Sequence, residues 1–220
     1  MKKYISILLA LLMTTCGYAQ TKADLFGNAP ITWLGLDLAH LKYTGKPSQH
    51  NNTGLITNAD LQTEFFPSWN ELFFNEQYKF NIASAVHRDF VGYAMDITRN
   101  ENRKVNKGYV TDNESEYQLL TTDSVSKFIE GYDFGRKKGI GMLFFVEGMN
   151  KRKREASAWV TFVDMGRKTV LLTERVTGKA GGAGFRNFWA HAFSNIVWNT
   201  GSEFDEWSSM AHGNSLFMNL

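Results

Sequence analysis

Cysteine and proline are scarce in this chain of 220 residues, which has one cysteine, Cys16, and three prolines. A lone cysteine cannot form a disulfide within the chain, so a disulfide-stapled scaffold is excluded and stability must come from a hydrophobic core. A chain of about 200 residues is long enough to bury such a core in one domain. After the N-terminal segment, no apolar run reaches the roughly 20 residues of a membrane-spanning helix. We therefore expect residues 20–220 to form a single globular domain.

Catalytic signatures are also absent from the sequence. It contains no H-E-x-x-H zinc motif, no G-x-S-x-G nucleophile elbow and no phosphate-binding P-loop. The pattern predicts no metal site and no cofactor, and it leaves open whether the protein is an enzyme. The histidines are too scattered for a local zinc site, since they stand at His40, His50, His87, His191 and His212.

Excess charge of one sign is missing as well. Lysine and arginine total 24 and aspartate and glutamate 22, and two of the lysines, Lys2 and Lys3, belong to the N-terminal segment. Without that segment the chain carries 22 residues of each sign. Binding to nucleic acid relies on a net positive field, so a nucleic-acid partner is not expected.

The N-terminal segment has the three-part order of a signal peptide. Two lysines are followed by a nine-residue apolar run at 5–13, and Gly17 and Ala19 place small residues before a cleavage point at Gln20. Such a run is too short to span a bilayer. The order predicts that residues 1–19 are removed and that the protein is exported to the periplasm or secreted.

Cys16 allows a second interpretation of the same segment. It stands where a lipoprotein signal places its acylated cysteine, and lipidation there would make the protein an outer-membrane lipoprotein. The preceding Met13-Thr14-Thr15 matches that signal poorly, because the usual pattern has a large aliphatic residue followed by small ones. Cleavage after Ala19 is the favoured interpretation, and lipidation at Cys16 is the alternative.

Hydrophobic periodicity divides the first half of the domain into alternating strands and helices. The apolar run at 31–38 is typical of a core strand, and residues 91–97 alternate in the period-2 pattern of a half-buried strand. In order, the pattern predicts a strand at 31–38, a loop at 43–60, a helix at 65–76, a strand at 91–97, a loop at 99–117 and a helix from a cap at Asp123 to near Gly135.

The second half has the clearest pattern. Residues 140–149 are apolar almost throughout, as expected of a strand buried on both faces, and short connectors lead to strands at 158–164 and 169–176. Such connectors favour an antiparallel three-strand meander. A helix then begins at Phe185, and Gly201 is expected to end it before a short final helix.

These elements predict an α+β fold in a single domain. The sheet is expected to be mixed or antiparallel, to contain about five strands and to end in the meander. Two or three helices should pack on it, because the apolar face of each layer has to be buried against another element.

Two stretches resemble motifs of an uncharacterised family of exported proteins from Bacteroidetes-type bacteria. The first is Trp69-Asn70-Glu71-Leu72 with Glu76 and Tyr78-Lys79 after it, and the second is the run GKAGGAGFRN at 178–187 with Trp189. The family brings no known activity. The element order is also similar to the α/β domain of the curli secretion channel and to the N-terminal domain of the Tol-system propeller protein, a likeness of topology that implies only a fold.

Asp37 and His40 are the candidate catalytic residues. They follow the first predicted strand, at the kind of strand end where α/β proteins place sites, and a carboxylate there could orient an imidazole for base catalysis. Ordinary strand-end polarity explains the same pattern. Glu147 and Asp164 fall near opposite ends of adjacent strands, so we do not expect the approach of roughly 5–10 Å that glycoside hydrolysis needs.

The glycine-rich run at 178–184 is a candidate ligand site. Gly181 and Gly182 let backbone N–H groups converge on an anion at the positive end of the following helix, and Arg186 adds further donors. The plain alternative is that the glycines permit a sharp turn and close packing of Trp189 on the sheet.

An up-down-up meander would bring a second basic segment to the same end of the sheet. The turn at 150–155 carries Lys151, Arg152, Lys153 and Arg154, which would approach Lys179 and Arg186. The resulting basic rim suits anionic lipid head groups, anionic glycans or an acidic protein. A solvated hairpin turn without a ligand is the alternative.

Together these features predict an exported envelope protein with a non-enzymatic binding or assembly role. Its expected partners are another envelope protein, anionic lipid or anionic glycan. Two alternatives stay open. One is a periplasmic or secreted hydrolase that acts on glycan or peptide through Asp37 and His40, and the other is an anion-binding module that uses the basic rim.

Overall fold

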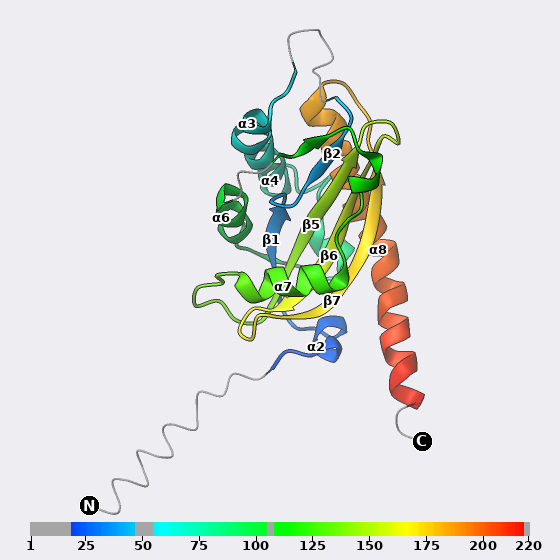
Figure 1. Ribbon diagram of the computed structural model, residues 1–220. Helices are drawn as coiled ribbons and strands as arrows, with labels where there is room; N and C mark the ends of the chain where they lie inside the picture. Colours follow the sequence, from blue (N-terminus) through cyan, green and yellow to red (C-terminus); the bar gives the residue numbers. More distant parts are fainter. Residues whose placement is uncertain (1–18, 47–54, 105–107, 218–220) are drawn as a thin grey trace, which may run out of the picture.

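The computed structural model describes residues 19–46, 55–104 and 108–217, with side chains as far as Ala211. The proposed signal peptide, including Cys16, therefore lies outside the described residues except for Ala19. One mixed sheet of seven strands stands at the centre of these residues, and helices cover both of its faces (Figure 1). The predicted single α+β domain with a mixed sheet is confirmed.

The C-terminal half of the sheet is the antiparallel meander that the sequence predicts. β5 (Ile140–Asn150) pairs with β6 (Glu155–Asp164), and β6 pairs with β7 (Thr169–Lys179), each in antiparallel register. Every residue of β5 is buried, because β5 lies in the middle of the sheet between two layers of helices. β7 forms the edge and is mostly exposed or half-buried.

The N-terminal half of the sheet is parallel. β1 (Ile31–Asp37) and β2 (Lys42–Thr44) pair with the same edge of β5, one after the other, and both run parallel to it. Two short strands extend this half outward: β3 (Gly92–Tyr93) pairs with β1, and β4 (Val110–Thr111) pairs with β2. The strand expected at 31–38 is confirmed, whereas β2 and β4 lie in segments that were expected to be loops.

The segment after β3 differs from its prediction. β3 bears out only the start of the strand expected at 91–97, because α6 (Asp96–Lys104) begins before that strand was expected to end. The loop expected at 99–117 is wrong where α6 continues through it. The face of α6 that packs on β1 carries the buried polar side chains of Thr98 and Asn102. Because so much of that face is polar, the periodicity of apolar residues does not reveal the helix.

One face of the sheet carries the larger part of the hydrophobic core. The helices that cover it are α2 (Lys22–Phe26), α4 (Phe66–Asn75), α5 (Ile82–Ala85) and α8 (Phe185–Phe217). α4 packs on β1 and α8 on β6 and β7, while α2 and α5 pack against α8. The helix expected at 65–76 is confirmed, and α3 (Asn58–Asp60) with a π-helical turn (Leu61–Phe65) extends it toward the N-terminus.

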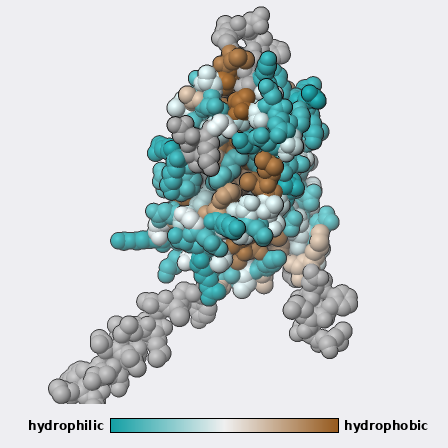
Figure 2. Space-filling model, in the orientation of Figure 1, coloured by the Kyte–Doolittle hydropathy of each residue, from teal (hydrophilic) through white to brown (hydrophobic). Residues whose placement is uncertain are grey.

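The opposite face carries a smaller hydrophobic cluster under α6 and α7 (Thr122–Gly131). α7 crosses in front of the strands in Figure 1, with α8 behind the sheet. The segment before α7, with its 3-10 turn η3 (Glu114–Glu116), lies over the same face. The helix expected from Asp123 to near Gly135 is present but ends earlier, at Gly131. Thr121 caps it in place of Asp123, because the Thr121 side chain accepts from Ser124 N. In Figure 2 this face is largely hydrophilic, and hydrophobic side chains show around α7 and at the top of the view.

α8 continues past the point where the sequence predicts its end. Gly201 lies inside the helix, and a Cβ on it would lie 3.6 Å from Ala85 Cα, so α5 packs directly against α8 there. Phe204 and Trp207 extend the buried face of α8 into the main core, which favours one long helix over two short ones. No helix within the described ranges is both long enough and apolar enough to cross a membrane.

Side-chain amides complete the free edge of β1 beyond Gly35. Asn70 of α4 accepts from Leu36 N at 2.7 Å and donates to Leu36 O at 3.1 Å, which is the pairing that a neighbouring strand would provide. Asn102 of α6 also donates to Leu36 O, at 2.9 Å, and accepts from Leu38 N at 2.7 Å. Gly35 has a φ of +104°, and a Cβ on it would lie 2.5 Å from Asn70 Oδ1, so glycine is required for this approach.

Candidate functional site

The β5–β6 turn and the loop between β7 and α8 meet at one end of the sheet. The register of the meander sets Glu155 opposite Lys179, and just beyond it Ala180 N donates to Arg154 O at 2.8 Å. The loop is tied in turn to α8, because the N–H of the next residue donates to Phe188 O at 3.1 Å. The two segments thus lie side by side, as the up-down-up meander requires.

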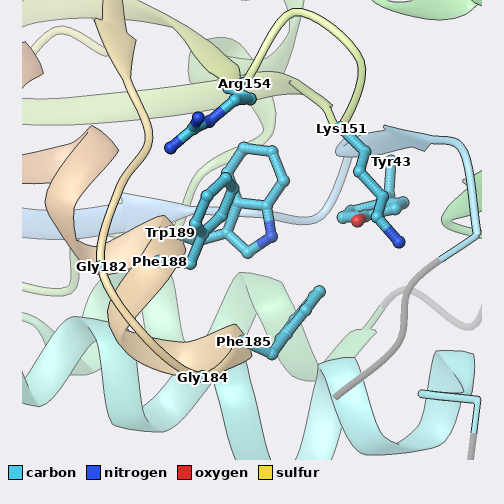
Figure 3. A pocket seen from close by; sticks show the side chains of 8 residues that line it. All are labelled: Tyr43, Lys151, Arg154, Gly182, Gly184, Phe185, Phe188 and Trp189. Atoms are coloured by element: carbon cyan, nitrogen blue, oxygen red, sulfur yellow. The ribbon is translucent and has the colours of Figure 1, made fainter. Parts of the chain in front are cut away.

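A cavity of about 280 Å³ opens between this turn and the start of α8. Figure 3 shows Arg154 and Lys151 reaching in from the turn, Phe185 facing them from the start of α8, and Trp189 and Tyr43 between. We call this cavity the aromatic pocket. Its lining consists of Tyr43, Lys151, Arg154, Gly182, Gly184, Phe185, Phe188 and Trp189.

Aromatic rings that pack on one another form the wall of the pocket. The ring centroid of Tyr43 on β2 lies 5.5 Å from that of Trp189 and 5.7 Å from that of Phe185. All three side chains are buried, so the wall is formed before any ligand binds. Burial raises the pKa of Tyr43, and this outweighs its hydrogen bond with Trp189, so the phenol stays neutral at physiological pH.

The charges on the pocket lining are positive. Arg154 has a left-handed φ of 51°, and its guanidinium lies over Phe188, 5.5 Å from the ring centroid. Within the described part of the chain this guanidinium forms no ion pair. Lys151 Nζ donates to Lys46 O at 2.8 Å. The first turn of α8, whose N–H groups have no partner within the helix, adds the positive end of its dipole.

Among the described residues, the lining therefore combines a preformed apolar wall with two cationic side chains and no carboxylate. Cations beside an apolar wall favour a bound anion. The arrangement therefore suits an anion that has an apolar part.

Some of the predicted ligand residues contribute to this pocket. Lys151 and Gly182 line it, and Gly181 lies in the loop beside it. The sequence places Arg154 in the basic rim without singling it out from its neighbours, and it assigns Trp189 to packing alone. The available signal was the place of Arg154 as the last residue of the turn, which is the position nearest to the glycine-rich loop.

Three other residues of the predicted basic rim make different contacts. Arg152 Nε lies 3.7 Å from Glu114 Oε1, and Lys179 Nζ lies 2.8 Å from Glu155 Oε2. Arg186 Nη1 donates to the side chain of the next residue at 3.1 Å. None of the three lines the aromatic pocket, so the rim is narrower than the sequence suggested.

Asp37 and His40, the candidate catalytic residues, lie away from the aromatic pocket. Asp37 is buried at the end of β1, where Tyr132 Oη and Ala39 N donate to its carboxylate. The His40 ring stacks on Phe128 of α7, with ring centroids 3.8 Å apart. Both side chains thereby hold α7 and the residues after it against the end of β1.

Asp37 is expected to make stability depend on pH in the opposite sense to an ordinary carboxylate. Burial raises its pKa from 3.8 to about 6, although the hydrogen bonds from Tyr132 and Ala39 favour the charged form. Between these two pH values the folded protein keeps a proton that the unfolded chain has released. The contribution of Asp37 to the free energy of unfolding therefore falls as the pH rises through this window.

Denaturant unfolding of the native protein and of Asp37→Asn, from about pH 4 to pH 7, measures this contribution. The asparagine cannot ionise, so the free energy of unfolding of the native protein, relative to that of Asp37→Asn, should be about 2–3 kcal/mol higher at pH 4 than at pH 7. The other carboxylates contribute equally to both proteins, so their contributions cancel in this difference. A difference that stays constant across this range would contradict the raised pKa.

Glu147 and Asp164 lie at opposite ends of adjacent strands, as predicted. Glu147 is buried and pairs with Arg175, with Nε 2.6 Å from Oε1. Asp164 stands opposite Ile140 in the β5–β6 register, at the far end of the sheet, so the two carboxylates cannot act on one bond. Across the described ranges, no three histidine, cysteine, aspartate or glutamate side chains form a group that could hold a metal ion.

Comparison with known proteins places the chain in no family. No family model matches it, and no curated protein or solved structure matches it either. The fold and the geometry of the aromatic pocket are therefore the basis for inferring function.

Proposed function

We propose that the protein is an exported, non-enzymatic binding protein whose aromatic pocket takes a small anion with a flat apolar part. One observation carries the proposal: the Arg154 guanidinium lines a preformed aromatic cavity that no carboxylate from the described ranges of the chain enters. An anion there would gain charge-assisted hydrogen bonds, which are stronger in a site of low dielectric than in water. The rings would cover its apolar part.

The size of the pocket restricts the ligand. At about 280 Å³ it lies near the lower end of the roughly 300–1,000 Å³ of small-molecule sites. An aromatic carboxylate or a phosphate ester of one ring matches this volume. Of an anionic lipid or glycan, only the charged terminal group would enter.

Export is the part of the proposal that the N-terminal sequence supports. Residues 1–19 have the charged, apolar and small-residue order of a signal peptide. N-terminal sequencing of the protein from its native cell should therefore begin at Gln20. A chain that keeps Met1 would contradict export and would leave the binding proposal to be judged by itself.

Replacing Arg154 by glutamine tests the binding proposal. Phenyl phosphate, which joins a flat ring to an anion, is the probe, and neutral phenol is its uncharged counterpart. Arg154→Gln removes the guanidinium from the pocket and should weaken the binding of phenyl phosphate about tenfold or more in a calorimetric titration. Rising ionic strength should weaken the binding of phenyl phosphate but not that of phenol.

Arg152→Gln is the matched control, because Arg152 belongs to the same turn but lies outside the pocket. Its side chain is 83% exposed, so its replacement should leave the affinity within about twofold. Two results would show that the pocket does not select anions. One is equal affinity of the native protein for phenyl phosphate and phenol. The other is an equal loss of affinity for phenyl phosphate in Arg154→Gln and Arg152→Gln.

A further inference from the structure

A second concavity lies between α5 and the middle of α8, and shares no residue with the aromatic pocket. Its volume is about 640 Å³, within the roughly 300–1,000 Å³ of small-ligand sites. The turn after α4 and the start of α5 form one wall, and the outward side of α8 forms the other. We call it the α5–α8 groove. Its lining includes Tyr78, Asn81, His87, Asn195, Trp198 and Asp205.

Two aromatic side chains lie exposed in the α5–α8 groove, one on each wall. Tyr78 is 77% exposed and Trp198 is 78% exposed. Trp198 interrupts the outward side of α8, where Ser194 and Asn195 are its polar neighbours. Neither ring packs in the core, so packing does not account for them. Large rings gathered in one concavity mark a binding surface.

The rest of the groove is polar but close to neutral. Lys79 Nζ lies 2.9 Å from Glu76 Oε2 and also lies over the Tyr78 ring, 5.2 Å from its centroid. His87 Nδ1 lies 3.3 Å from Asp205 Oδ1. The charges at the groove are therefore balanced by their own neighbours. Uncharged amides and hydroxyls supply the remaining polar lining, from Asn81, Ser84, Ser194, Asn195 and Ser202.

We propose that the α5–α8 groove binds a neutral carbohydrate chain. A sugar ring has an apolar C–H face that stacks on an aromatic ring, and hydroxyl groups at its edge that pair with amides and hydroxyls. The groove offers both kinds of contact in one concavity. A protein partner would need a continuous apolar centre within roughly 1,200–2,000 Å² of buried surface. Most of the residues that line this groove are polar.

Affinity electrophoresis of the full mature protein tests this proposal. Native gels that contain hydroxyethyl cellulose, galactomannan or pullulan present neutral chains of different linkage, and at least one of them should retard the protein. Trp198→Ala removes one wall ring and should weaken that retardation about tenfold or more, as truncation of an anchoring aromatic does. Tyr78→Ala should weaken it in the same direction.

Phe90→Ala is the matched control, because Phe90 is 75% exposed but does not line the groove. It should bind as the native protein does, and so should Arg154→Gln, whose change lies in the other pocket. The proposal would be overturned if none of the three polysaccharides retarded the protein. It would also be overturned if Trp198→Ala and Phe90→Ala lost retardation equally. A lower sedimentation coefficient for Trp198→Ala without any retardation would identify a contact between proteins instead and would also overturn it.

Discussion

Replacing Gly178 by alanine is expected to lower the free energy of unfolding by about 3 kcal/mol or more. A Cβ at this position of β7 would lie 2.1 Å from the carbonyl oxygen of Ala192 and 2.9 Å from the amide nitrogen of Ile196. Both atoms belong to the backbone of α8, so no side-chain rotation can relieve the overlap. The helix itself would have to move away from the sheet. Thermal unfolding should show a fall in Tm of roughly 6–12 °C.

Gly131→Ala is the matched control for this substitution. Gly131 is the last residue of α7, and a Cβ on it would meet no atom within 4 Å. Alanine there should change the free energy of unfolding by less than about 0.5 kcal/mol, or raise it slightly because alanine favours the helix. If Gly178→Ala cost no more than Gly131→Ala, the close packing of α8 on β7 would be wrong.

The same displacement should impair the aromatic pocket. Phe185 and Trp189 stand on the first turns of α8, whereas Tyr43 stands on β2 and Arg154 on the β5–β6 turn. Moving α8 away from β7 separates these two halves of the lining. Gly178→Ala should therefore weaken the binding of phenyl phosphate even in the fraction of molecules that stays folded.

The meander could be predicted because its signals are local in the sequence. An apolar run at 140–149 and two short polar connectors specify three adjacent antiparallel strands. That topology is enough to bring the β5–β6 turn beside the glycine-rich loop. The place of the candidate site, and Lys151 and Gly182 within it, therefore follow from the sequence.

The parallel half of the sheet lacks such signals. β2 and β4 are very short and are formed by pairing with strands far away in the sequence, which local patterns do not record. The helix α6 is held by Thr98 and Asn102, whose side chains bond to the backbone of β1. A buried face built on hydrogen bonds has no apolar period, so the segment resembles a strand followed by a loop.

The aromatic wall of the pocket could not be predicted from the sequence for a related reason. Phe185 and Trp189 share one face of α8 with side chains that fill the core, and their spacing cannot separate a ring that lines a cavity from one that fills it. Tyr43 belongs to a strand that only distant pairing creates. Arg154 reaches the pocket and Arg152 does not, because the direction of each depends on the backbone of the turn, where Arg154 has a φ of 51°.

Glu147→Ala is the second substitution with a large expected effect, a loss of about 3–5 kcal/mol in the free energy of unfolding. Oε1 of this buried carboxylate accepts from Arg175 Nε at 2.6 Å and from Ser157 Oγ at 2.7 Å. Oε2 accepts from Trp159 Nε1 at 3.1 Å and from Leu120 N at 3.2 Å. Alanine would leave all of these donors, one of them charged, without their acceptor.

Two further variants separate the cost of breaking the pair from the cost of losing a carboxylate. Glu76→Ala removes a carboxylate whose cationic partner, Lys79, is 54% exposed, and should cost no more than about 1 kcal/mol. The double substitution Glu147→Leu with Arg175→Met replaces both charges by apolar side chains and should recover much of the loss. A double variant no more stable than Glu147→Ala would show that the unpaired arginine is not the source of the cost.

The position of Glu147 also predicts which part of the protein opens when the pair is lost. Glu147 accepts from Leu120 N, and Arg175 Nη2 donates to Leu120 O at 2.9 Å, so the ion pair holds the segment before α7 against the sheet. In Glu147→Ala, amide hydrogen exchange should accelerate at Leu120 and along α7, while the amides shared by β5 and β6 stay protected. Acceleration spread evenly over the sheet would mean that Glu147 stabilises the whole core and does not fasten this one segment to it.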